Sequence, residues 1–71
     1  MFYLKDNVFG KYVKSIVPLK SGVRAIYFDS QPGTGARWAT RKGAESAVEK
    51  LKRTGTNPPG VADCLAVVEI D

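Results

Sequence analysis

Only one stretch of the sequence clearly repeats its apolar residues at helical spacing, and it lies between Thr40 and Gly55. Four apolar residues recur there at intervals of three or four positions, which places them in one stripe along a helix: Ala44, Ala47, Val48 and Leu51. Thr40 can cap the free amide groups of the first turn, and Gly55 can end the last one. We therefore predict one helix near residues 41–53, with an alanine-rich stripe that packs closely against a sheet.

The segments before this helix are typical of strands. A short apolar stretch at residues 2–5 ends at Asp6 and Asn7, whose side chains can bond nearby backbone groups in a turn. Residues 11–17 and 23–28 are rich in β-branched and aromatic side chains, and the loop between them contains proline and glycine. This pattern predicts a β-hairpin.

The rest of the chain adds loops and further strands. Residues 29–35 carry the signals of a loop, and residues 36–38 allow one more short strand. Residues 54–63 form an extended connection, and residues 64–70 form a last strand whose two apolar faces place it inside the sheet rather than at its edge. The predicted order is β-β-β-(β)-α-β. It describes one α+β domain over residues 1–71, with an antiparallel sheet of four to five strands and one helix packed on one face.

The two faces of the predicted hairpin differ in character. If Val17 pairs with Val23, one face is small and apolar and matches the alanine-rich helix, and it carries Val13, Ser15, Val17, Val23, Ala25 and Tyr27. The other face mixes aromatic, aliphatic and basic side chains: Tyr12, Lys14, Ile16, Arg24, Ile26 and Phe28. This sorting depends on the register, because a slip of one residue on one strand would scramble it.

Three interpretations of the mixed face remain open. Aromatic rings interleaved with lysine and arginine can stack nucleic-acid bases while the cations neutralise phosphates. An exposed surface that is both apolar and basic also suits a protein interface. In the third interpretation the N-terminal strand or the loops cover part of this face, and it has no binding role.

A second basic cluster surrounds the start of the helix and consists of Arg37, Trp38, Arg41 and Lys42. The helix dipole disfavours positive charge in the first turn, so a phosphate or an acidic partner drawn to the exposed amides would offset that cost. In the alternative interpretation Glu45, four residues after Arg41, neutralises a solvated turn. Trp38 then simply closes the end of the core.

The composition argues against catalysis and against a metal or cofactor. The chain has no histidine, so the usual general base is missing, and its single cysteine, Cys64, can form neither a zinc site nor an internal disulfide. Cys64 begins the apolar run of the last strand, so we expect it to be buried. Residues 33–35 resemble a phosphate-binding loop only weakly, because they lack a third glycine and a following lysine. We expect a non-enzyme without a cofactor.

The charge and the hydropathy of the sequence limit the kinds of partner and the cellular compartment that we expect. Eleven basic residues against seven acidic ones give a net charge of +4, a mild excess that favours nucleic acid or an acidic protein surface. The longest apolar run, residues 64–68, is far too short for a membrane span. The N-terminal apolar stretch meets Lys5 and Asp6 too soon for a signal peptide. Together with the lone cysteine, these features predict a cytoplasmic protein.

Residues 36–44 (ARWATRKGA) join an aromatic strand end to a capping threonine and an alanine that opens the helix. This pattern resembles small bacteriophage and prophage proteins in which a meander of strands precedes one helix. The resemblance implies a binding protein that redirects or inhibits a host protein or an immunity complex in the host cytoplasm. The same residues resemble the arm-binding domains of phage integrases, which would place Tyr12, Lys14, Arg24 and Ile26 in a DNA groove. Those domains end with the helix, whereas this chain continues to Ile70. A nucleic-acid-binding module is therefore the alternative function.

Overall fold

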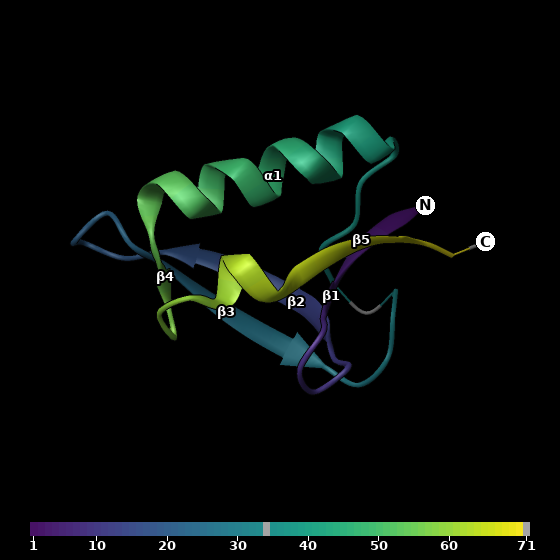
Figure 1. The fold of residues 1–71 in the computed structure, drawn as a ribbon, viewed down its shortest axis with the longest axis horizontal. Coiled ribbons are helices and arrows are strands. Elements are labelled where there is room, and N and C mark those ends of the chain that lie inside the picture. The colour runs from purple at the N-terminus through teal and green to yellow at the C-terminus, as the bar shows by residue number, and fades with distance from the viewer. Residues whose placement is uncertain (34, 71) are drawn as a thin grey trace.

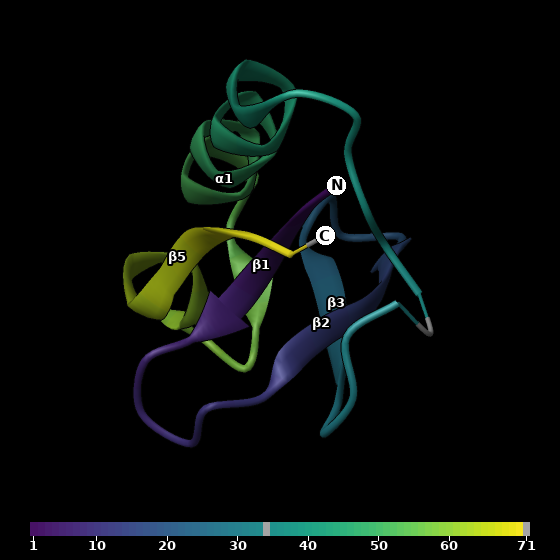
Figure 2. The same ribbon diagram turned by 90° about the vertical axis from the view of Figure 1, so that its right-hand side faces the viewer.

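A computed structural model describes residues 1–33 and 35–70, which form five strands and one α-helix (Figure 1). Along the chain, the elements are β1 (Phe2–Asp6), β2 (Tyr12–Pro18), β3 (Arg24–Asp29), α1 (Arg41–Thr54), β4 (Thr56–Asn57), a 3₁₀ helix η1 (Val61–Cys64) and β5 (Leu65–Glu69). The helix lies across one face of a mostly antiparallel sheet (Figures 1 and 2). The predicted α+β class is confirmed.

Local signals set both ends of α1, as the sequence predicts. The Thr40 hydroxyl oxygen accepts a hydrogen bond of 3.0 Å from the Gly43 N–H and so satisfies one free donor of the first turn. At the other end Gly55 takes a positive φ of 84°, and its N–H donates to the Leu51 carbonyl at 2.9 Å. Three residues of the predicted stripe are buried, namely Ala44, Val48 and Leu51.

The strand order is β4-β3-β2-β1-β5, so the last strand lies at one edge of the sheet (Figure 2). The prediction of an interior strand at residues 64–70 is therefore wrong. That prediction assumed that a strand with apolar residues on both faces also has a neighbouring strand on both edges. The burial of a strand's faces and the pairing of its edges are independent, and β1 occupies the interior place beside β5.

The short extra strand is also placed differently from the prediction. Two-residue β4 follows the helix and pairs in parallel with β3, with Arg24 opposite Thr56. Residues 36–38 instead lie between β1 and β2, where those strands diverge. There the Ala36 N–H donates to the Lys14 carbonyl at 2.9 Å, and Phe2 and Trp38 exchange two backbone hydrogen bonds of 2.8 and 2.9 Å.

The predicted register of the hairpin is wrong by two residues, because Val17 pairs with Ala25 and not with Val23. The predicted core face is wrong as well. Ile16, Ile26 and Phe28 face the core, and Ser15, Val17 and Tyr27 face away from it. A bulge at Lys14 shifts the register and turns Val13 to the core side. The small residues of the helix stripe leave volume that large sheet side chains fill, so a small sheet face would have left a cavity.

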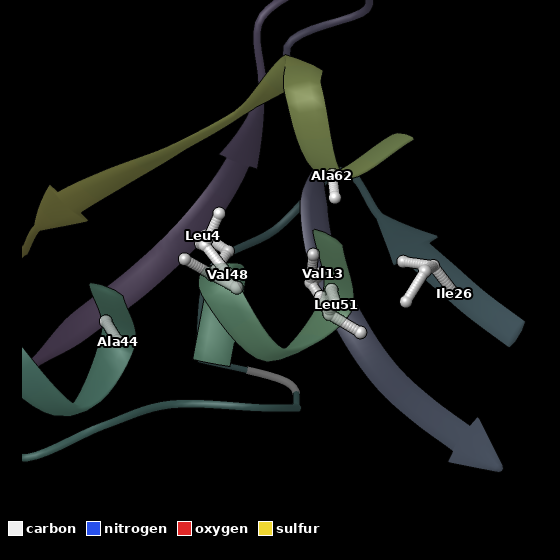
Figure 3. Close-up of a cluster of buried hydrophobic side chains, with 7 residues drawn as sticks. All are labelled: Leu4, Val13, Ile26, Ala44, Val48, Leu51 and Ala62. Atoms are coloured by element: carbon white, nitrogen blue, oxygen red, sulfur yellow. The ribbon is translucent and has the colours of Figure 1, made fainter. Parts of the chain in front are cut away.

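The core lies between α1 and the sheet (Figure 3). Seven buried side chains from the sheet, the helix and η1 form it: Leu4, Val13, Ile26, Ala44, Val48, Leu51 and Ala62. Trp38 is half-buried and packs against this cluster, in agreement with its interpretation as the residue that closes one end of the core.

The opposite face of the sheet is partly covered by the segment that joins β3 to α1. Tyr3 is buried on this side, and Gly33 approaches its hydroxyl group. Gly35 lies directly on the Lys14 backbone, where a Cβ atom would overlap the Lys14 carbonyl. The glycine at this position is therefore required by close packing and needs no ligand to explain it. Thr34, the middle residue of the weak phosphate-loop pattern, lies outside the described residues.

Within the described part of the chain, the length and apolar content of the helices fall short of what a membrane crossing needs.

Candidate partner-binding site

The most exposed large apolar side chains lie in the turn between β1 and β2. We call residues 7–11 the Phe9 turn. Phe9 is 79% exposed and Val8 is 65% exposed, although the two are neighbours at the tip of one short turn. A single exposed apolar residue is ordinary, but two adjacent large ones next to an apolar groove are a candidate interaction surface.

Asp6 holds this turn in one conformation. The residue is 8% exposed, its Oδ1 atom accepts from the Val8 N–H and its Oδ2 atom accepts from the Phe9 N–H, each at 3.1 Å. Its backbone closes the turn as well, because the Asp6 N–H donates to the Lys11 carbonyl at 2.7 Å and the Asp6 carbonyl accepts from the Gly10 N–H at 2.9 Å. The predicted turn at Asp6 and Asn7 is confirmed, and the carboxylate of Asp6 makes it.

A second contact fixes the turn to the rest of the domain. The Asn7 N–H donates to the Cys64 carbonyl at 2.8 Å, which joins the turn to the end of η1. Gly10 has a φ of 73°, a conformation that other residues rarely adopt, so the chain can return into β2. The exposed side chains of Val8 and Phe9 therefore stand on a backbone anchored at both of its ends.

An apolar groove of about 470 Å³ lies beside the turn. It extends from the turn to the connection between β4 and η1, and its lining residues are Asp6, Val8, Phe9, Lys11, Phe28, Pro58, Pro59, Gly60, Val61 and Cys64. The Thr56 hydroxyl donates to the Pro58 carbonyl at 2.8 Å and fixes this wall. Cys64 ends η1 and is half-buried on the groove, so the expectation that it is buried in the last strand is wrong.

The groove offers shape and apolar contact and little charge. Lys11 is the one cation among its lining residues, and the Asp6 oxygens already accept two backbone N–H groups. Such a surface suits an apolar side chain of a partner, with a carboxylate placed near Lys11. Among residues 1–33 and 35–70, no group of three or more histidine, cysteine or acidic residues could hold a metal ion.

The predicted basic and aromatic sheet face does not exist as one surface. Ile26 is 5% exposed and belongs to the core, and Phe28 is half-buried between the core and the groove. Arg24 is half-buried at the β4 side of the sheet. Tyr12 lies on the opposite face, where its ring meets Tyr3 edge-on at 6.4 Å. These residues therefore do not share one exposed face, and the register on which that sorting depended is wrong.

Some of these residues remain available to a partner. Lys14 is exposed at the bulge in β2, and the Nζ atom of Lys5 lies 5.5 Å from the centre of the Tyr12 ring. The sequence analysis assigned Tyr27 to the core face. In the structure Tyr27 is 54% exposed and lies, like Tyr12, on the face of the sheet away from the helix. A partner contact at Tyr12 or Lys14 stays a prediction.

The second predicted cluster stays together near the start of α1. Arg37, Arg41 and Lys42 are exposed, and the guanidinium of Arg41 lies 5.3 Å from the centre of the Phe2 ring. This cation–π contact offers Arg41 a neighbour within the chain itself. Lys42 lines a different groove, between α1 and β5. Binding of a partner by these cations also stays a prediction.

The sequence analysis did not predict four residues of this site: Val8, Phe9, Pro58 and Pro59. The signal for the first two was present, since two large apolar residues inside a turn that ends in glycine have no place in the core of a hairpin. No local signal places Pro58 and Pro59 opposite them, because that contact joins distant parts of the chain. Comparisons with protein-family models, curated proteins and solved structures found no match for this chain.

Proposed function

We propose that this chain is a non-enzymatic binding protein that docks a partner protein through the Phe9 turn and the adjoining apolar groove. The observation that carries the proposal is the exposure of Phe9, at 79%, on a turn fixed by Asp6. Burial of a large apolar side chain contributes about 1.5–3 kcal/mol. In the folded chain Phe9 is exposed, so this stabilisation is not gained. A partner that buries Phe9 would gain it on binding.

The fixed backbone supports the same proposal. A mobile turn would have to be ordered on binding, which opposes association. Here the Asp6 carboxylate and the hydrogen bond from Asn7 to Cys64 already order the turn. The turn therefore loses less conformational entropy when a partner buries it, and binding is tighter for the same buried area. Aromatic residues that insert into a pocket are also the residues that dominate the energy of protein interfaces.

The chemistry of the surface supports a protein with an apolar anchor and an acidic rim. The groove walls contain proline, valine and phenylalanine, with Lys11 at the margin, and the chain as a whole carries a charge of +4. A nucleic-acid site needs several cations along its path, and this groove has one. The resemblance to small phage proteins extends the proposal to a host protein that is redirected or blocked by the contact.

A nucleic-acid-binding module is the second candidate. It is favoured by the exposed ring of Tyr27 together with Tyr12 and Lys5 on the face of the sheet away from the helix, and by the exposed Lys14 at the bulge in β2. Exposed aromatic side chains near cations can stack unpaired bases. This surface and the Phe9 groove are different parts of the molecule, so variants separate the two candidates.

The experiment that tests the proposal is site-specific photo-crosslinking in a bacterial lysate. A photoreactive phenylalanine derivative replaces Phe9 in one variant and Leu19 in a matched control, since Leu19 is also exposed and lies in the other hairpin turn. We expect one defined protein to be captured from position 9, with or without nuclease, and not from position 19. Equal capture from both positions, or capture that nuclease abolishes, would contradict the proposal.

A further inference from the structure

The outer edge of β5 is a five-residue strand edge without a partner in the described chain. β5 pairs with β1 along its whole length, from Phe2 opposite Glu69 to Asp6 opposite Leu65, without a bulge. It ends the strand order, and among residues 1–33 and 35–70 no strand pairs with its other side (Figure 2). Among the usual means by which proteins protect an open edge, the strand has no proline and no bulge, and its one charged residue is Glu69 at its C-terminal end.

The backbone hydrogen bonds between β5 and β1 determine which backbone groups of β5 point outward. The Ile70 N–H donates to the Met1 carbonyl at 3.0 Å, and the Cys64 carbonyl accepts from Asn7 at 2.8 Å. In an antiparallel ladder these directions alternate, so even-numbered residues face β1 and Leu65, Val67 and Glu69 face outward. The Leu65 N–H donates to the Ala62 carbonyl. The outward donors of β5 are therefore the N–H groups of Val67 and Glu69.

The outward-facing residues Leu65, Val67 and Glu69 are symmetric about Val67, and we propose that two copies of the chain pair through β5 in an antiparallel, two-fold arrangement. Val67 then lies opposite Val67 of the second copy, and the two exchange both of their backbone hydrogen bonds. Each Glu69 N–H donates to the Leu65 carbonyl of the other copy. All four outward donors of the two strands find acceptors, and the two sheets become one.

The side chains agree with this register. A groove of about 500 Å³ lies between α1 and β5, on the face where Leu65 and Val67 meet the core. In the paired state Glu69 of the second copy lies on this face, directly opposite Leu65. Lys52 lines the groove there, and it also borders a smaller hollow beside Asp63, just before β5 begins. The pairing therefore brings opposite charges together at each end of the shared edge.

A second copy fits this edge better than an unrelated strand for two reasons. Any extended peptide could bond to the backbone, but the outward-facing residues Leu65, Val67 and Glu69 are spaced symmetrically about Val67, so each free donor of one copy meets a carbonyl of the other. The groove is lined by two lysines and two glutamates, Lys42, Lys52, Glu45 and Glu49, so it has no net charge that would select a strongly charged peptide. The one charged residue of β5, Glu69, is opposite in charge to Lys52 of the second copy, which it approaches in the paired state.

Sedimentation equilibrium of the whole chain, from about 10 µM to 1 mM, tests the pairing in the range of weak to moderate association. We expect the average mass to rise with concentration from 7.7 kDa toward twice that value. Glu69→Pro removes an outward donor that the fold does not use, and we expect it to weaken dimerisation roughly 10- to 100-fold. Glu69→Gln is the matched control for the N–H group, because it keeps that donor and changes only the charge.

A charge exchange tests the register with two exposed residues. Lys52→Glu and Glu69→Lys should each weaken dimerisation by about 10-fold, and the double variant should restore it. This test also holds if Glu69→Pro fails to fold. A chain that stays monomeric at 1 mM, including one whose β5 edge binds an added peptide instead, would overturn the proposal. So would a dimer that ignores all of these variants or that dissociates on Phe9→Ala.

Discussion

Replacement of Asp6 by alanine is expected to release the Phe9 turn and to destabilise the domain. The carboxylate accepts two backbone N–H groups at 3.1 Å, and Asp6 as a residue is 8% exposed, so its replacement removes two hydrogen bonds made by a largely buried charged residue. Such bonds contribute about 1.5–3 kcal/mol each when their partners cannot find water. The Val8 and Phe9 amides lie in an exposed turn and can be rehydrated in part. We therefore expect a loss of about 2–4 kcal/mol for the pair.

This loss is large for a chain of 71 residues, whose whole stability is about 4–10 kcal/mol. Asp6→Asn keeps one oxygen acceptor and should lose about half as much. Denaturant unfolding measures the stability, and amide hydrogen exchange at Val8 and Phe9 reports the turn itself. Unfolding free energies of Asp6→Ala within about 0.5 kcal/mol of the parent, with unchanged exchange at both amides, would refute the role given to Asp6.

Three further predictions concern the core, the segment that joins β3 to α1, and the alternative function. Leu51→Ala should cost about 2–5 kcal/mol, because Leu51 is 4% exposed in the core, and a melting temperature within a degree or two of the parent would contradict this. Gly35→Ala should lower the melting temperature clearly, because its Cβ atom would overlap the Lys14 carbonyl, and an unchanged melting curve would show that the loop packs elsewhere. In low salt the chain should fail to bind generic DNA or RNA at about 100 µM. Binding that weakens steeply with salt and is lost on Lys14→Ala would instead favour the nucleic-acid function.

The helix could be predicted from the sequence because its signals are local. The threonine cap, the stripe of apolar residues and the terminal glycine all lie within sixteen consecutive positions, residues 40–55. The turn at Asp6 was predictable for the same reason, since its carboxylate bonds to residues two and three positions away. Each of these features is set by neighbours in the sequence.

The sheet was predictable in its class but not in its details. The bulge at Lys14 accompanies a contact with Ala36, more than twenty residues away, and it decides that Val13 faces the core. The place of β5 at the edge depends on β1, which enters between β5 and β2 from the other end of the chain. Apolar residues that alternate along a strand specify which side chains share a face, but they do not specify which face is buried.

The candidate site shows the same limit. An apolar pair in a turn was visible at Val8 and Phe9, and its exposure could have been inferred from the hairpin alone. The groove also needs Pro58, Pro59 and Cys64, which reach the turn only in the folded chain. Recognition of the site therefore requires the tertiary structure.

The affinity of the captured partner for two alanine variants tests the central proposal most directly. Phe9→Ala and Leu19→Ala both shorten exposed apolar residues, so neither should change the stability of the domain by more than about 0.5 kcal/mol. Titration calorimetry with the purified partner should show that Phe9→Ala weakens binding by about 2–4 kcal/mol, roughly 30- to 1,000-fold in Kd. Leu19→Ala should leave the Kd within a factor of about two. Equal affinities for the two variants would contradict the assignment of the Phe9 turn as the binding site.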